Sequence, residues 1–415
     1  MLDQQLAIDG GTPLRKRPFG PGHEFGDADV AAIAEVIHSG NVGKGPRVDQ
    51  FEREFADRHG VKYAATVNSG TAAMHTCVAA INPDPGDEII TTPWTSGGTI
   101  IGTLLHNCVP IFADIDDTYN LDPEDVERKI TPRTRAIMPV HLFGNPCDMT
   151  ALRDIADRHG LWLIEDCCQS PFAEHKGQIV GTFGDIAGFS FGGKHLSAGM
   201  GGIVLTNNKS LWDRAILFRD AALPRDNGPF EGRPYANYFL APNYKINDII
   251  AALLLSQLQK VDGYIENKIR DARNIIDGLA DIAGIVPQRV REGDRNTYWN
   301  LGFTIDADGL GWTAPDFAAA VSAEGVPMGG PYLLTPEVGP LYRNPFLADP
   351  KLYGNSRFPL DAGRDRPVDY RQVFLPVGEE LMSRGINFAM VPTLTEEDVA
   401  DIIQAIRKVA QSRRH

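Results

Sequence analysis

The sequence predicts an α/β protein in which a large domain with a mostly parallel sheet precedes a smaller α+β domain. Three observations support this fold class. Seven short apolar runs between residues 63 and 206 have the length and composition of strands buried on both faces. Segments with helical periodicity separate most of these runs, as is typical of parallel sheets covered by helices. After residue 280 the pattern loosens and becomes richer in glycine and proline.

The elements of the large domain follow in chain order. Two helices come first, at residues 27–38 and 48–59, with apolar positions that include Val36, Phe51 and Phe55. The strands are expected at residues 63–67, 88–91, 109–113, 136–140, 161–164, 186–191 and 202–206. The helices between them are expected at residues 71–81, 99–106, 123–130 and 148–159. Because ligands of such sheets bind beyond the carboxyl ends of the strands, we expect functional residues there.

The remaining elements indicate a second domain. A long helix at residues 247–279 is expected to leave the large domain, and a strand at 298–305 and a helix at 396–410 follow it. We therefore expect a large domain over residues 25–265 and a small C-terminal domain over residues 266–415. The N-terminal arm, residues 1–24, is expected to pack with the small domain.

Composition and charge disfavour several classes of protein. The formal net charge of −14 argues against binding to nucleic acid or to an anionic membrane surface. The longest apolar run, residues 249–255, is too short to span a bilayer. The five cysteines form an odd set without CxxC spacing, which indicates reduced thiols and a cytoplasmic protein, with neither a disulfide framework nor a zinc site.

Lys194 is the residue whose position is most suggestive of chemistry. It lies in a glycine-rich turn, Phe191-Gly-Gly-Lys-His195, directly after the predicted strand at 186–191. Burial in such a turn lowers the pKa of a lysine, and the neutral amine is a nucleophile for aldehydes. The alternative is a surface lysine in a glycine loop.

Asp166 and Gln169 follow the neighbouring predicted strand. Asp166 ends the run Leu161-Trp-Leu-Ile-Glu-Asp166, and Gln169 lies three residues further on. A carboxylate there could keep a pyridine nitrogen protonated, while Gln169 could reach the same pocket as a neutral hydrogen-bonding group. An aldehyde-reactive lysine and a carboxylate for a ring nitrogen are what pyridoxal 5′-phosphate (PLP) requires. As alternatives, Asp166 caps a helix and Gln169 is a solvated loop residue.

Two further segments lie at strand ends. The segment Asn68-Ser-Gly-Thr71 opens a helix, where free amides and the helix dipole favour a phosphate group. The alternative is an ordinary N-cap made by Ser69 or Thr71. Trp94 follows the next strand and could stack on a cofactor ring, or it could pack in the core.

The acidic cluster Asp114-Ile-Asp-Asp117 has the composition of a metal site. Acids at the junction of a strand and a turn usually cap helices or stabilise turns, so we expect no metal here.

These segments together resemble the DegT/DnrJ/EryC1/StrS aminotransferases, which act on sugars and cyclitols. The resemblance extends from about residue 25 to the C-terminus and is strongest over residues 60–260. The matching segments are Asn68–Ala73, Pro83–Ile90, Ile130–Ile137, Val140–Gly144, Ile164–Ser170, Gly188–Gly202 and Asn243–Asn247. The resemblance implies a PLP-dependent transferase of fold type I, like aspartate aminotransferase.

The resemblance also implies roles for single residues. Lys194 matches the lysine that forms the Schiff base with PLP, and Asp166 matches the partner of the pyridinium nitrogen. Gln169 matches the residue beside the 3-hydroxyl group, and Trp94 matches the aromatic stacking position.

Further residues match family positions that contact the cofactor phosphate or lie at the subunit interface. Gly70, Thr71 and Ser190 match contacts to the cofactor phosphate. Asn243 matches a residue that reaches the active site of the partner subunit, so the resemblance implies a homodimer with shared active sites.

Three departures from the family pattern concern the surroundings of the cofactor. The step from Ser190 to Lys194 is one residue shorter than usual. Met200 replaces an acidic residue, and Lys245 replaces an arginine. Lysine keeps the charge but loses the bidentate geometry that suits a carboxylate. Met200 and Lys245 affect contacts to the substrate or the amino donor, whereas the shorter step affects the role of Ser190 as a phosphate contact.

The activity implied is transfer of an amino group from an amino acid, glutamate or glutamine, to a keto-sugar or keto-cyclitol, with pyridoxamine 5′-phosphate as the intermediate carrier. The Glu-Asp-Cys-x-Gln-Ser motif at 165–170 and Asn344–Leu347 most resemble enzymes that use scyllo-inosose-type ketones. The alternatives are a PLP-dependent keto-sugar dehydratase, in which histidine replaces the lysine, and a non-catalytic regulatory protein of the same fold.

Overall fold

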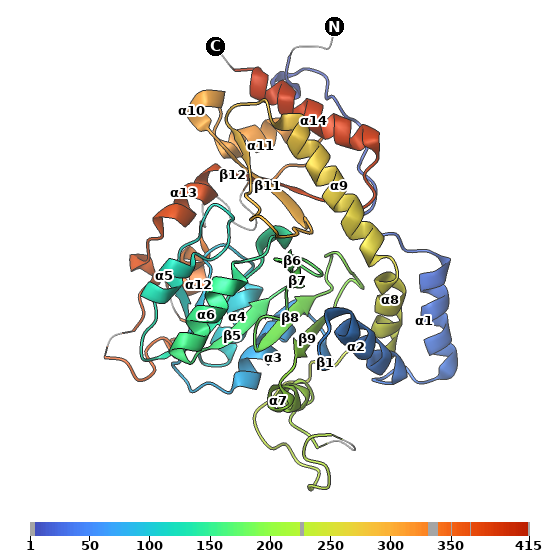
Figure 1. Cartoon of the computed structure of the whole chain (residues 1–415), viewed down its shortest axis with the longest axis vertical. Helices are drawn as coiled ribbons and strands as arrows, with labels where there is room; N and C mark the ends of the chain where they lie inside the picture. Colours follow the sequence, from blue (N-terminus) through green and yellow to red (C-terminus); the bar gives the residue numbers. More distant parts are fainter. Residues whose placement is uncertain (1–4, 225–227, 331–338, 350, 366, 414–415) are drawn as a thin grey trace.

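The computed structural model describes residues 5–224, 228–330, 339–349, 351–365 and 367–413. A seven-stranded sheet with the order β1-β9-β8-β5-β4-β2-β3 forms its centre (Figure 1). The strands are β1 Tyr63–Val67, β2 Glu88–Thr91, β3 Val109–Phe112, β4 Thr134–Met138, β5 Trp162–Asp166, β8 Ile186–Ser190 and β9 Gly202–Thr206. Within this sheet β9 runs antiparallel to β1 and β8, and the other pairs are parallel. The predicted mostly parallel sheet is confirmed.

Helices cover both faces of the sheet. They are α2 Pro46–His59, α3 Gly70–Ile81, α4 Gly98–Leu105, α5 Pro123–Arg128, α6 Met149–His159 and α7 Lys209–Arg219. The first helix, α1 Asp27–Ser39, packs against α8 Asp248–Leu258. Along β9, Ile203 and Leu205 pack in the core that contains α2, whereas Val204 packs in the core that contains α3 and α7. Because each strand buries side chains on both faces, the sequence shows unbroken apolar runs there instead of alternation.

The helix predicted at residues 247–279 is two helices, α8 Asp248–Leu258 and α9 Val261–Leu279. The break lies where the N-terminal segment crosses the helix axis: the side chains of Gln257 and Lys260 both donate hydrogen bonds to the carbonyl oxygen of Glu24. Lys260 also pairs with Asp29 of α1 at 2.8 Å. Periodicity alone does not reveal this joint, because both helices keep an apolar face.

A three-stranded antiparallel sheet builds the second core. It consists of β10 Ile285–Pro287, β11 Asn300–Ile305 and β12 Gly385–Ala389, in that order. The helices α11 Ala314–Ala323 and α14 Glu396–Gln411 and the end of α9 pack against it. The shorter elements are η1 Ala7–Asp9, η2 Leu142–Gly144, β6 Glu174–His175, β7 Gln178–Ile179, α10 Ala307–Leu310, η3 Leu341–Arg343, α12 Pro345–Ala348, η4 Tyr370–Gln372 and α13 Pro376–Arg384.

The packing gives a physical basis for a division into domains. Leu6 is buried in the core of the small sheet, and Arg15 pairs with Asp398 and Asp401 of α14. We propose a large domain over residues 25–265 and a small domain over 266–415 that carries the N-terminal arm. The segment between residues 341 and 375 belongs to the small domain by sequence but packs on the large domain, because its buried side chains contact β3 and α4. Residues 331–338, in the part of the chain after residue 280 that is rich in glycine and proline, lie outside the described residues.

None of the helices in the described ranges combines the length and the apolar character that a bilayer crossing requires.

We predict that Phe55→Ala strongly destabilises the large domain. Phe55 is fully buried, and its ring packs against Phe51, Phe189 and Phe191. Truncation of such a side chain costs about 3–5 kcal/mol, so the midpoint of urea unfolding should fall clearly. Phe374→Ala is the control, because Phe374 is 66% exposed. Equal midpoints for the two variants would show that this aromatic cluster does not support the domain.

Candidate active site

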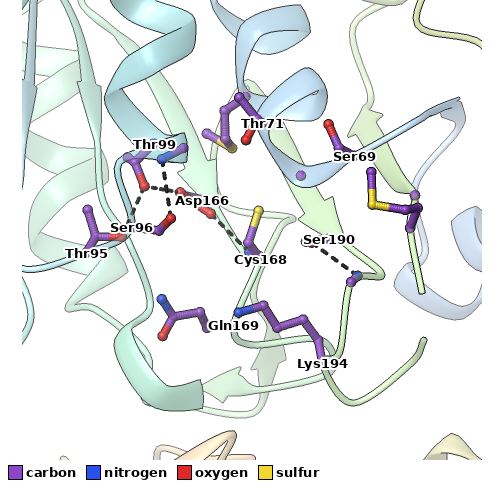
Figure 2. Close-up of a pocket in the computed structure, with 16 residues that line it drawn as sticks. Ser69, Thr71, Thr95, Ser96, Thr99, Asp166, Cys168, Gln169, Ser190 and Lys194 are labelled. Carbon is purple, nitrogen blue, oxygen red and sulfur yellow. Dashed lines mark hydrogen bonds between the residues drawn. The ribbon is translucent and has the colours of Figure 1, made fainter. Parts of the chain in front are cut away.

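A pocket lies beyond the carboxyl ends of β1, β2, β5 and β8 (Figure 2). Loops and helix starts that follow these strands form its walls. The lining residues include Ser69, Gly70, Thr71, Thr95, Ser96, Thr99, Asp166, Cys168, Gln169, Ser190, Lys194 and Met200. Six of the eight residues that the sequence suggested for the site are therefore in one pocket, and they are Gly70, Thr71, Asp166, Gln169, Ser190 and Lys194.

Lys194 points into this pocket from the turn that follows β8. Burial lowers its pKa to about 8, although the nearby Cys168 and Asp166 act in the opposite direction. Nζ lies 3.2 Å from the centre of the Trp299 ring. No carboxylate in the described part of the chain forms an ion pair with this amine. An amine with a pKa near neutrality and no ion-pair partner is available for nucleophilic attack.

Asp166 ends β5 and is 2% exposed. Its Oδ2 accepts a hydrogen bond from Thr99 Oγ1 at 2.8 Å, and its Oδ1 accepts one from the backbone N–H of Cys168 at 3.0 Å. Among the described residues no cation pairs with this carboxylate. A buried carboxylate is costly without a positively charged partner, so its position suits a ligand that brings a protonated nitrogen.

The start of α3 forms another wall. Ser69 is the N-cap, and its Oγ accepts a hydrogen bond from the N–H of Ala72 at 3.1 Å. Gly70 and Thr71 line the pocket in the first turn, where backbone N–H groups have no intrahelical acceptor. A side chain at Gly70 would come within 2.6 Å of the Ser190 Cβ atom, so only glycine permits this close approach. Ser69 therefore caps the helix, as the alternative had it, while the free N–H groups of the same turn still face the pocket and could bind an anion.

Gln169 is buried and does not belong to a solvated loop. Its Oε1 accepts a hydrogen bond from the backbone N–H of Phe143 at 2.9 Å. This bond fixes the amide beside Lys194 at the pocket wall (Figure 2).

Trp94 requires a correction. Its side chain is 1% exposed and packs against Tyr119, with ring centres 4.8 Å apart, and against Phe143. It does not line the pocket, whereas Ser96, two residues later, does. The core-packing alternative describes Trp94, because the chain after β2 turns this side chain away from the pocket.

Asn243 also lies outside the pocket of its own chain. It is exposed and forms an isolated bridge with Asp220. The neighbouring Lys245 pairs with the Asp220 carboxylate, so its charge is compensated within the chain.

Thr99, Cys168 and Trp299 are among the residues of the site that the sequence interpretation missed. Thr99 could be suspected only from its position in the first turn of α4, the helix that follows β2. Cys168 lines the pocket, whereas the adjacent Cys167 is buried, and the sequence alone does not distinguish the two cysteines. Trp299 precedes β11 of the small domain, and no local pattern connects it with Lys194.

The acidic cluster at residues 114–117 has structural partners. Asp114 accepts hydrogen bonds from the N–H groups of Val377 and Gly378, and Asp116 and Asp117 pair with arginines. These contacts correspond to capping and turn stabilisation.

The geometry agrees with comparisons to known proteins. The model of the DegT/DnrJ/EryC1/StrS aminotransferase family matches residues 24–356. The chain belongs to this family. L-glutamine:2-deoxy-scyllo-inosose aminotransferase from Streptomyces kanamyceticus is 35% identical over 432 residues, covering 100% of this chain and 98% of that protein. The resemblance is thus confirmed, and the chain is an aminotransferase.

Further relatives show the breadth of the family. GDP-perosamine synthase from Vibrio cholerae is 36% identical over 281 residues, covering 66% of this chain and 74% of that protein. Among solved structures, 3-amino-5-hydroxybenzoic acid (AHBA) synthase has a TM-score of 0.83 at 27% identity, covering 95% of this chain and 99% of that one.

Proposed function

We propose that this aminotransferase binds PLP in the pocket described above and transfers an amino group from glutamine or glutamate to a keto-cyclitol or keto-sugar. The observation that carries the proposal is the meeting of three groups in one pocket. These groups are the amine of Lys194, the carboxylate of Asp166 and the open first turn of α3. Neither the amine nor the carboxylate forms an ion pair with any residue that the structure describes.

The residues fit the parts of PLP in a consistent way. The amides of Gly70 and Thr71 and the hydroxyl of Ser190 would hold the phosphate group. Asp166 would hold the ring nitrogen, which supplies the cation that this buried carboxylate lacks. Lys194 would hold the aldehyde carbon.

The chemistry divides between cofactor and chain. Bound PLP supplies an electrophilic aldehyde and an electron-withdrawing ring. The amine of Lys194 would take up and return the proton of the donor Cα. Asp166 would keep a proton on the ring nitrogen, and Thr99 and the Cys168 amide hold this carboxylate in place.

Substrate class follows from the relatives. The protein from Streptomyces kanamyceticus that is named for glutamine and 2-deoxy-scyllo-inosose aligns with the whole chain. We therefore favour a scyllo-inosose-type ketone as acceptor and glutamine as donor. A keto-sugar is the second class, because GDP-perosamine synthase is also similar.

We further propose a homodimer with shared sites, located in the cytoplasm. Asn243 is exposed and outside its own pocket, so a second chain is needed for it to reach a cofactor. Apolar side chains lie exposed around the pocket: Met200 is 57% exposed, and Ile101 and Leu105 project from α4, whose first turn lines the pocket. Residues 228–242 extend from the large domain below α7 and include the exposed Leu240 (Figure 1). A partner that covers these side chains would complete the pocket.

The covalent link tests the cofactor assignment. Borohydride should fix PLP to Lys194 in the wild-type protein, and peptide mass spectrometry should find the adduct there. Lys194→Ala should lose both the adduct and turnover, whereas Lys176→Ala, at an exposed position, should keep both. An adduct at another lysine in wild type would refute the assignment.

Asp166→Asn should keep the fold and lose activity. Asparagine cannot stabilise a protonated ring nitrogen, and electrostatic contributions of this kind are worth on the order of a hundredfold or more in rate. Steady-state kinetics with circular dichroism would measure this, with Asp157→Asn on the surface of α6 as control. A near-normal rate in Asp166→Asn would rule out the proposed role.

Subunit exchange tests the shared site. Mixing Lys194→Ala with Asn243→Ala chains should give heterodimers in which one site carries both defects and the other carries neither. Activity should then exceed that of either parent. Mixing Lys194→Ala with Asp166→Asn is the control, because both residues line the pocket of their own chain and no intact site can form. Equal outcomes for the two mixtures, after confirmed exchange, would mean that each site is built by one chain.

A further inference from the structure

Trp299 of the small domain and Lys194 of the large domain are in direct contact. The Nζ atom of Lys194 lies 3.2 Å from the centre of the Trp299 ring. The indole Nε1–H of Trp299 also donates a hydrogen bond to the carbonyl oxygen of Gly193, at 3.2 Å. One side chain therefore contacts both the amine and the turn that carries it.

The chain holds Trp299 in this position from several sides. Its backbone N–H donates to the carbonyl of Phe143 at 2.7 Å, and its carbonyl accepts from the N–H of Met390 at 3.2 Å. Two residues earlier, the carbonyl of Thr297 accepts a hydrogen bond from Nε2 of His195 at 2.8 Å. The lysine turn and the segment before β11 are thus tied together on both sides of Lys194.

Within the described ranges, no carboxylate forms an ion pair with the ammonium group of Lys194. The titratable groups that face it are Asp166 at the end of β5, Cys168 after that strand, His195 beside it, His23 of the N-terminal segment and Lys268 of α9. Burial lowers the pKa of His195 well below its usual range, and burial with the charge of Lys194 lowers the pKa of Lys268 to about 7. The Trp299 ring face, which attracts a cation, is therefore in contact with an ammonium group that has no carboxylate partner.

We propose that Trp299 is a positioning residue that holds the amine of Lys194 whenever that amine is not attached to the cofactor. The role rests on the proposed function, in which the lysine leaves the cofactor and returns in each catalytic cycle. The ring gives the released, protonated amine a fixed resting place inside the pocket. The hydrogen bond to Gly193 keeps the backbone of the turn still while the side chain moves.

The pKa of Lys194 in the full-length, cofactor-free chain tests this role. Trace acetic anhydride labels amines in proportion to their neutral fraction, and peptide mass spectrometry then gives the midpoint for Lys194 as the pH is raised. Trp299→Leu should lower this midpoint by about half a unit to one and a half units, because the ring no longer stabilises the charged form. Trp299→Phe keeps a weaker aromatic face and should lower it less.

The control is Trp212→Leu, since the Trp212 ring lies 5.1 Å from Nζ of Lys209 on another surface. It should leave the midpoint of Lys194 unchanged. An unchanged midpoint in Trp299→Leu would overturn the proposal. A raised midpoint would also overturn it, because the ring would then act only by excluding water. If Trp299→Leu fails to fold by circular dichroism, the direction of the shift in Trp299→Phe decides. The assay involves neither cofactor nor turnover, so its failure is distinct from failure of the proposed aminotransfer.

Discussion

The parallel pairing of β5 with β8 is the constraint on which the site depends. Asp166 at the end of β5 stands in register with Gly188 of β8, and β8 leads directly to Ser190 and Lys194. Because parallel strands end at the same edge of a sheet, a carboxylate and an amine distant in sequence are brought into one pocket. A register shift of one residue would turn Asp166 to the opposite face.

The residue before Asp166 shows how the same strand secures this register. Glu165 points to the other face, where its carboxylate accepts hydrogen bonds from the N–H groups of Gly181, Phe183 and Gly184. These residues precede β8, so Glu165 ties the approach of β8 to β5. With His141 and Cys167, Glu165 forms a buried group of residue types that can bind a metal. Its carboxylate oxygens already accept the three backbone hydrogen bonds, and Oε2 lies 3.3 Å from His141 Nε2. The two adjacent carboxylates thus serve different purposes: one fixes the fold, and the other faces the pocket.

Much of this arrangement could be predicted from the sequence because it depends on strand ends. The apolar runs located the strands, and position after a run was enough to suggest Asp166, Gln169 and Lys194. Position after a strand does not tell whether a loop side chain points into the pocket or into the core. Trp94 follows β2 as expected and yet packs in the core, while Ser96 faces the pocket.

Contacts between segments that are distant in the chain are the second kind of feature that could not be predicted from the sequence. Trp299 reaches Lys194 only because the segment before β11 is bonded to the Phe143 turn, and no periodicity reports such docking. The break between α8 and α9 likewise depends on the side chain of Lys260 meeting Glu24 and Asp29. Both features arise where the two domains and the N-terminal arm meet, and they become visible only in three dimensions.

The central claim is that the protein uses PLP, bound in the pocket of Lys194 and Asp166, to transfer an amino group from an amino acid to a ring ketone. The most direct measurement is the absorbance of the PLP-loaded protein during the two half-reactions, each followed separately. Glutamine should convert the PLP spectrum to that of pyridoxamine 5′-phosphate, and a scyllo-inosose-type ketone should restore it with formation of the amino product. A PLP spectrum that no amino donor changes, or a pyridoxamine form that neither inososes nor keto-sugars convert back, would contradict the account.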